Sequence, residues 1–228
     1  MIGIGEICFA TRTGYAGLSR QQVPVSLFLC ESEYDRCLRG GHFGKSLLQF
    51  NANVEKLFLQ MDENFEAQQV QMHDKIVTEV DAGSTANVLF VKKNKKINDY
   101  ELICCNCGDS RSILCTGRSN EDIIALSYDH KPKQRNEKRR IENAGGFVSF
   151  DRINGELAVS RCFGDFLYKQ HRGGKDRRNQ MVVAVPEIER ITIDYVHDQF
   201  QFVVMACDGV WDVLNNRQVG QFVLSRLK

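Results

Sequence analysis

The chain has 228 residues, of which 43% are hydrophobic and 26% are charged, and its formal net charge is +1. This balance is typical of a globular protein with a substantial core, and the near-neutral charge does not favour nucleic acid or a membrane surface as a partner. No apolar stretch approaches the roughly 20 residues that a membrane-spanning helix needs, so we expect no membrane insertion.

The cysteines and the first thirty residues indicate the cellular compartment in which the protein is found. Glu6, Arg12 and Arg20 interrupt the apolar positions near the start of the chain, which is not typical of a secretory signal. Without such a signal, nine cysteines predict free thiols in a reducing environment rather than a disulfide framework. We therefore expect a cytoplasmic protein, with the nucleus as the alternative.

Hydrophobic patterning predicts secondary structure along the first half of the chain. Residues 23–30 are expected to form a buried strand. From Ser46 to about Met72, apolar residues recur at helical spacing and leave Gln49, Glu55 and Asp62 to face water. Strands rich in β-branched and small apolar residues are predicted at 85–91, 102–107 and 112–116, with the lysine-rich run 92–96 as a solvated loop.

The second half combines short strands with two helices. A helix is predicted from Pro132 to Asn143, ending at Gly145–Gly146. Asn215 or Asn216 is expected to cap a final helix that carries Val219, Phe222, Val223 and Leu227. Strands are predicted at 181–185, 188–193 and 200–206. No repeat or linker divides the chain, so we expect one α+β domain over residues 1–228.

The segment Ala206–Asp212 (Ala-Cys-Asp-Gly-Val-Trp-Asp) carries the strongest chemical signal. A carboxylate that follows a buried strand and precedes a glycine can approach a hard cation closely, and Mg²⁺ and Mn²⁺ prefer oxygen ligands. A lone Asp-Gly pair is more often a simple turn. The longer match makes Asp208 a candidate metal ligand.

Four segments together closely resemble the metal-dependent serine/threonine phosphatases of the protein phosphatase 2C, or PPM, family: Gly108–Arg111, Asp129–Pro132, Asn154–Asp165 and Ala206–Asp212. The resemblance implies a four-layer α-β-β-α sandwich of two antiparallel sheets with helices outside. It also implies that Asp208 is a metal ligand, that Trp211 packs in the core, and that Asp109 lies near the metal centre and can hold a further, weaker metal. Arg161 and Asp165 fall in a mainly architectural stretch.

The N-terminal third departs from the family pattern, in which a glycine, an aromatic residue and a phosphate-binding arginine precede an acidic pair. On Gly14–Gln21 the arginine becomes Ala16, and the acidic pair becomes Arg20 and Gln21. The exchange removes a bidentate phosphate donor and replaces a carboxylate with a cation, which repels a metal. We expect Arg20 to reach Asp208 or Asp109 and neutralise it.

A second departure affects the family's Asp-Gly-His-Gly-Gly element, which supplies a bridging metal ligand and the general acid. Here Asp35 and His42 are the candidates, but inserted residues separate them, and Glu31 is an alternative ligand. A histidine in such a loop is also often a plain surface residue. The family's C-terminal helix and strand, which carry another metal-binding Asp, do not appear before Lys228, so either the metal site lacks this ligand or the missing strand lies beyond Lys228. We expect the sheet edge left open to be covered by a protein partner or a larger assembly.

These departures predict a pseudophosphatase, that is, a phosphatase fold that serves as a binding, regulatory or scaffold module and needs no metal cofactor. The alternative is an active Mg²⁺- or Mn²⁺-dependent protein serine/threonine phosphatase that uses Asp208, Asp109 and Asp35. The partner is expected to be a protein, such as a phosphoprotein. The basic segment 168–180, including Arg177 and Arg178, is either a contact for that partner or a solvated loop.

Three other motifs support rival functions less well. Residues 40–46 resemble a phosphate-binding loop, but the motif needs a glycine where Arg39 stands. Cys104 and Cys107 in one strand point to opposite faces, which disfavours a zinc site. The basic run 131–140 contains Glu137 and lacks aromatic residues, so a solvated helix face is expected there rather than a nucleic-acid patch.

Overall fold

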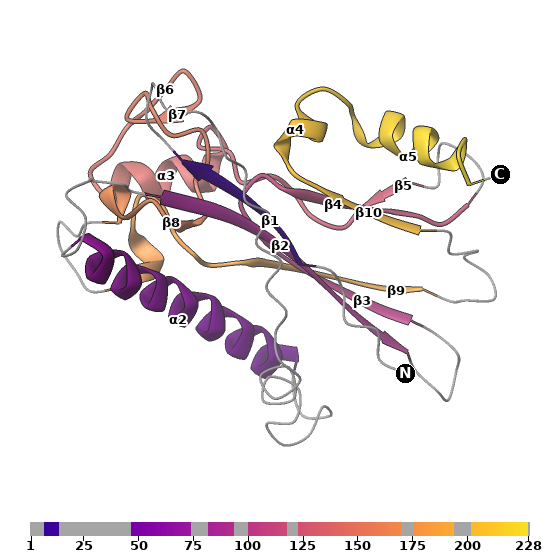
Figure 1. Cartoon of the computed structure of the whole chain (residues 1–228), viewed down its shortest axis with the longest axis horizontal. Coiled ribbons are helices and arrows are strands. Elements are labelled where there is room, and N and C mark those ends of the chain that lie inside the picture. Colours follow the sequence, from indigo (N-terminus) through magenta and orange to yellow (C-terminus); the bar gives the residue numbers. More distant parts are fainter. Residues whose placement is uncertain are drawn as a thin grey trace.

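The computed structural model describes residues 7–13, 47–73, 82–93, 100–117, 123–169, 176–193 and 202–227. Within these ranges two antiparallel sheets are stacked on each other, with helices on their outer faces (Figure 1). The strand expected at 23–30 lies outside the described residues.

The first sheet has the strand order β1-β2-β3-β9, and a short strand, β8, also pairs with β2. The second sheet has the order β10-β4-β5, and β6 and β7 form a separate hairpin. The bounds are β1 Ile7–Thr13, β2 Ala82–Lys93, β3 Tyr100–Cys107, β4 Arg111–Cys115, β5 Ile123–Ala125, β6 Val148–Ser149, β7 Arg152–Ile153, β8 Phe163–Gly164, β9 Glu187–Ile193 and β10 Phe202–Ala206.

The helices agree with most of the predicted ones. Helix α2 covers Leu47–His73, α3 covers Arg135–Asn143, α4 covers Asp208–Trp211 and α5 covers Asn216–Leu224, with 3-10 turns at Phe166–Tyr168 and Arg177–Asn179. Asn215 caps α5 in a capping box with Gln218. Two boundaries were predicted wrongly: α3 begins three residues after Pro132, and Leu227 lies beyond the end of α5.

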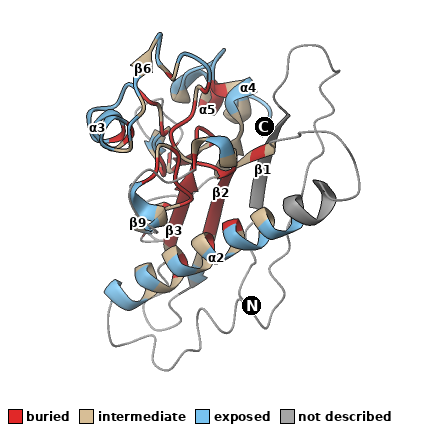
Figure 2. Ribbon diagram, turned by 90° about the vertical axis from the view of Figure 1, so that its left-hand side faces the viewer, coloured by how far each residue is buried: buried red, intermediate tan, exposed pale blue. Residues whose placement is uncertain are grey.

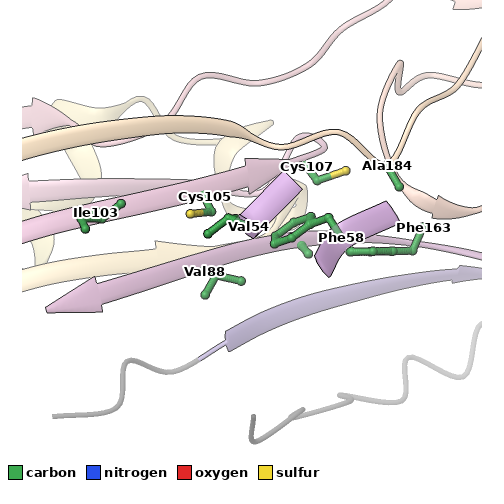
Figure 3. Packing of buried hydrophobic residues seen from close by; sticks show 9 residues of the cluster. Val54, Phe58, Val88, Ile103, Cys105, Cys107, Phe163 and Ala184 are labelled. Atoms are coloured by element: carbon green, nitrogen blue, oxygen red, sulfur yellow. The ribbon is translucent and has the colours of Figure 1, made fainter. Parts of the chain in front are cut away.

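Side chains of β3 point alternately into two layers of the hydrophobic core, one on each face of the first sheet. Cys105 and Cys107 face α2, where they join Val54 and Phe58 in one core cluster (Figure 3). Their neighbour Cys104 faces the second sheet and belongs to a separate cluster. Because successive residues of a strand point to opposite faces, one strand serves both layers. Figure 2 shows the central strands buried and the outer face of α2 exposed.

A third layer of the hydrophobic core lies between the second sheet and the C-terminal helices. Leu114 of β4 packs toward the first sheet, whereas Ile113 packs against Trp211 and Val219. The order is therefore α2, first sheet, second sheet, and then α4 with α5 (Figure 1). The predicted α-β-β-α sandwich is confirmed.

One predicted strand is absent, and β1 and the short strands β5 to β8 were not predicted. Residues 181–185 form no strand, and only an isolated bridge from Val183 to Arg161 is present there. Strand β1 was not predicted at all, although its whole length pairs with β2. Local sequence does not reveal such a strand, because its pairing partner is about seventy residues away.

Asp62 of α2 is buried, so the prediction that it faces water was wrong. Its side chain is 1% exposed and accepts a hydrogen bond from the Lys169 ammonium at 2.7 Å and from the Gly164 backbone N–H at 2.9 Å. Helical periodicity identifies the inner face of α2 but not a polar residue on it that meets a buried cation. The pair ties α2 to the segment that follows β8.

The cysteines whose side chains the structure describes are free thiols, as expected. Cys104, Cys105, Cys107, Cys115 and Cys162 are buried, and Cys207 is partly exposed. Burial raises the pKa of the Cys104 thiol to about 11, so this thiol stays protonated and inert at neutral pH. Cys104 and Cys107 lie on opposite faces of β3, which removes the basis for a zinc site between them. Within the described ranges, no helix combines the length and apolar character needed to cross a membrane.

Candidate metal centre

The turn Gly108–Arg111 joins β3 to β4, as the sequence predicted, but the two strands belong to different sheets. The turn therefore crosses the rim of the sandwich and carries Asp109 to a position between the two layers. Asp109 is 6% exposed, which is unusual for a carboxylate. A buried carboxylate needs a cation or hydrogen-bond donors around it.

Asp208 lies at the same rim because of the register of the second sheet. Ala206 of β10 pairs with Arg111 of β4 in an antiparallel ladder. The ladder ends at this pair, so Asp208, two residues after Ala206, and Asp109, two residues before Arg111, both leave the sheet at the same end. Burial raises the pKa of Asp109, and the negative charge of Asp208 adds to this shift, which is consistent with the two carboxylates lying close together. Asp208 itself is exposed.

Three consecutive residues, Asp129, His130 and Lys131, hold the turn. The Asp129 carboxylate accepts two hydrogen bonds from the Arg111 guanidinium, both at 2.7 Å. His130 contacts Gly108, and the Lys131 ammonium lies 2.6 Å from the Asp109 carboxylate. The Asp-His-Lys segment thus fixes the turn almost residue by residue.

His130 makes a double contact with Gly108. Its backbone N–H donates to the Gly108 carbonyl at 2.9 Å, and its ring Nδ1 accepts the Gly108 N–H at 3.1 Å. Burial lowers the pKa of His130, and a neutral ring is required if Nδ1 is to accept a hydrogen bond. Nε2 lies 3.6 Å from the Glu187 carboxylate, too far for a strong hydrogen bond. His130 therefore orients the backbone beside Asp109.

A buried polar layer supports the turn from below. The Asn106 amide donates to the Gly108 carbonyl at 3.1 Å and to the Tyr128 carbonyl at 2.8 Å. Asn87 in turn donates to Asn106 and to Ser127, and accepts from Ser112. These side chains link both sheets through satisfied hydrogen bonds, so the rim beneath Asp109 is rigid.

Arg111 connects this rim to the C-terminal helices. Besides Asp129, its guanidinium donates to the Asn216 side chain at 2.7 Å and lies 5.1 Å from the centre of the Trp211 ring. Trp211 is buried and donates its indole N–H to the Ala206 carbonyl, which confirms its packing role. Arg111 therefore fixes the start of α5 and the end of α4 against the strand that leads from Asp109.

Gly108 is required by both conformation and space. Its φ is +129°, and a Cβ added there would lie 2.3 Å from a Thr85 methyl carbon. We expect Gly108→Ala to lower the free energy of unfolding by about 2–4 kcal/mol, through strain and overpacking together. Gly145→Ala is the control, because Gly145 also has a positive φ but a Cβ added to it would meet no atom within 4 Å. Urea unfolding of both variants checks this, and equal losses would show that the clash is unimportant.

Asp109 and Asp208 suit a divalent metal in their chemistry, because hard cations such as Mg²⁺ and Mn²⁺ take carboxylate oxygens and keep several waters. Among the described residues, no group of three or more potential ligands gathers at one point. Asp35 and His42 lie outside the described residues, as do Ala16, Arg20 and Gln21, so their predicted roles stay predictions. The described part of the centre consists of the carboxylates of Asp109 and Asp208, and the first of these forms an ion pair with Lys131.

The comparisons with known proteins decide the family. The family described as "PP2C: Protein phosphatase 2C" matches residues 42–228, which is more than half of the chain. The chain belongs to the protein phosphatase 2C family. Its relatives include Protein phosphatase 1A of Mus musculus, 35% identical over 96% of this chain and 53% of that protein. Protein phosphatase 2C 1 of Paramecium tetraurelia is 37% identical over 86% of this chain and 62% of that protein.

The chain thus spans about half to two thirds of the length of these two phosphatase 2C relatives. A third, Probable protein phosphatase 2C 4 of Paramecium tetraurelia, is 35% identical over 99% of this chain and 80% of that protein. Among solved structures, a phosphatase from Toxoplasma gondii has a TM-score of 0.62 at 21% identity, covering 99% of this chain and 84% of that one. A Caenorhabditis elegans sex determining protein has 0.57 at 24% identity, covering 84% and 41%. These structures support the fold alone.

Within this phosphatase 2C domain, Glu137 is the centre of a buried ionic network. The prediction that it belongs to a solvated helix face was wrong. Glu137 is 3% exposed and accepts hydrogen bonds from Arg140, Arg161 and Ser160. Although burial raises the pKa of Glu137, the hydrogen bond from Arg161 and the charges of both arginines outweigh burial and lower it to about 2. The architectural role expected for Arg161 is thus visible as an ion pair between α3 and the segment before β8.

The described end of the basic segment 168–180 is held by ion pairs within the fold. Arg177 forms ion pairs with three acidic residues of α2, namely Asp62, Glu63 and Glu66. Arg178 pairs with Glu55 of the same helix. These contacts disfavour the hypothesis that Arg177 and Arg178 are open contacts for a phosphoprotein. They instead fix the start of the segment before β9 on α2.

The roles of His130 and Lys131 in this phosphatase 2C centre were not predicted from the sequence. Both stand in the Asp129–Pro132 motif, which belongs to the resemblance but suggests no function for either residue on its own. Their partners in the Gly108–Arg111 turn became apparent only from the tertiary structure.

Proposed function

We propose that this chain is the phosphatase domain of a metal-dependent protein phosphatase that hydrolyses phosphoserine and phosphothreonine. The observation that supports it best is the placement of Asp109 and Asp208 at the same end of the β10–β4 ladder, at the rim of a phosphatase 2C sandwich, where the charge of Asp208 acts on Asp109. Two relatives that are at least 35% identical and bear the names of protein phosphatases add support.

The residues of the chain contribute position and charge to this activity. Asp208 is exposed and can meet a cation and a phosphoprotein from solvent, whereas Asp109 is buried and fixed by the turn. A Mg²⁺ or Mn²⁺ pair, when bound, supplies a nucleophilic water at neutral pH and neutralises phosphate charge. His130 and Asn106 hold the turn that carries Asp109, and Arg111 contacts Trp211 in α4, the helix that begins at Asp208, so that little reorganisation of the backbone is needed during the reaction.

The test is hydrolysis of a phosphothreonine peptide by the purified chain with excess Mn²⁺ or Mg²⁺. We expect phosphate release that depends on the metal, disappears with a chelator and returns when metal is added back. A phosphotyrosine peptide of the same sequence serves as the control for substrate class. Absence of turnover with either metal would contradict the proposal.

A pseudophosphatase is the second candidate, and it rests on the N-terminal departures. The family match begins at residue 42, so Ala16, Arg20 and Gln21 fall outside it. In this case the fold would act as a binding or scaffold module for a protein partner. Strand β10 is an edge strand among the described strands of its sheet and offers a place where another strand could add. Phosphopeptide binding without turnover would favour this candidate.

A further inference from the structure

The ammonium of Lys131 contacts the carboxylate of Asp109, which is a candidate metal ligand. The ammonium lies 2.6 Å from Asp109 Oδ2. A lysine ammonium is charged at neutral pH, so the contact is an ion pair.

The two partners differ in how firmly they are held. The Asp109 side chain is 8% exposed and sits in a turn fixed by His130 and Asn106, whereas the Lys131 side chain is 27% exposed. In the described part of the chain, Asp109 is the only hydrogen-bond partner of the Lys131 ammonium. A lysine side chain is long and flexible, and its ammonium is a compact point charge that water solvates well. Lys131 can therefore withdraw toward solvent while Asp109 stays in place.

The same carboxylate cannot serve both cations at full strength. A divalent ion on Asp109 must displace the ammonium or be repelled by it at a few ångströms, and either outcome costs binding free energy. Without any cation, Asp109 would remain buried and facing the charge of Asp208, which destabilises the fold. Lys131 thus stabilises the metal-free protein and opposes the metal.

We propose that Lys131 is a built-in counter-cation that competes with a divalent metal for Asp109 and so sets the metal affinity of this position. The inference rests on the proposed function only in taking Asp109 as a metal ligand. The ion pair explains how Asp109 can stay buried in the metal-free protein without destabilising the turn that carries it. The inference also assigns a role to the lysine of the Asp129–Pro132 motif.

The experiment compares Mn²⁺ binding and thermal stability of the wild type, Lys131→Met and Lys133→Met. Lys133 is the matched control, because it lies two residues away and pairs with the exposed Asp151. Calorimetry at neutral pH is expected to show at least about tenfold tighter Mn²⁺ binding for Lys131→Met than for the wild type, within the usual range of such couplings. Without metal, the Tm of Lys131→Met should be lower than that of the wild type, and Mn²⁺ should raise it by a larger amount. Lys133→Met should match the wild type in both.

Unchanged or weaker Mn²⁺ binding by Lys131→Met would overturn the inference, as would the absence of binding by every variant. If Lys131→Met does not fold, Lys131→Gln keeps a hydrogen-bond donor for Asp109 without the charge and is expected to bind Mn²⁺ more tightly than the wild type. Adding Asp109→Asn to either variant should remove the gain. Turnover is measured separately, so tight Mn²⁺ binding without hydrolysis would sink the proposed function and leave this inference standing.

Discussion

Asp208→Asn is expected to lower the kcat/KM for a phosphothreonine peptide by at least about 100-fold. Asn keeps the shape of the side chain but removes the charge that holds a hard cation, and even residues that only support metal ligands cost about 10–100-fold when changed. Because Asp208 is exposed, the free energy of unfolding should change by less than about 0.5 kcal/mol. Steady-state kinetics at saturating Mn²⁺, together with urea unfolding, measure both quantities.

The control for this substitution is Asp151→Asn, which removes an exposed carboxylate of the β6–β7 hairpin that pairs with Lys133. Its activity should equal that of the wild type, because exposed ion pairs contribute little. If Asp208→Asn retained full activity, Asp208 would not be a metal ligand. A scaffold, by contrast, would keep its partner binding in both variants.

Glu137→Gln is expected to cost about 3–5 kcal/mol of the free energy of unfolding at pH 7. The substitution leaves Arg140 and Arg161 without the buried carboxylate that both contact, and an uncompensated buried charge is strongly destabilising. Glu142→Gln is the control on the same helix, because Glu142 is half-exposed and its contact with Lys138 is 3.8 Å long. Urea unfolding should show a loss of less than about 0.5 kcal/mol for this control.

The same network predicts a pH dependence. The pKa of Glu137 falls from 4.5 to about 2 in the folded protein, so its stabilisation is complete above pH 4.5 and is lost as the pH falls toward 2. The wild type should therefore lose about 3 kcal/mol through this group between about pH 5 and pH 2. Glu137→Gln should lack that part of the slope. Parallel pH profiles for the two proteins would show that Glu137 does not titrate with the low pKa.

Most of the fold could be predicted from sequence because its signals are local. The period of α2, the β-branched residues of β2 to β4 and the Asn215 cap all depend on neighbouring residues. Strand β1 and the segment 181–185 could not be assigned correctly, since a strand is stabilised by its pairing partner as much as by its own residues.

The centre could be predicted only in part. Motif resemblance identified Asp109 and Asp208 as candidates, but their approach depends on the pairing of β10 with β4, which no local pattern reveals. Buried charges were missed for a related reason. Asp62 and Glu137 were expected to face water because they are acidic residues on helices, yet their cationic partners lie far along the chain at Lys169 and Arg161.

Mn²⁺ calorimetry on the wild type and on the double variant Asp109→Asn/Asp208→Asn tests the central claim most directly. We expect saturable binding to the wild type and none to the double variant under the same conditions, because both carboxylates of the rim would be gone. Equal binding by the two proteins, or no binding by the wild type up to millimolar Mn²⁺, would contradict a metal centre built on Asp109 and Asp208.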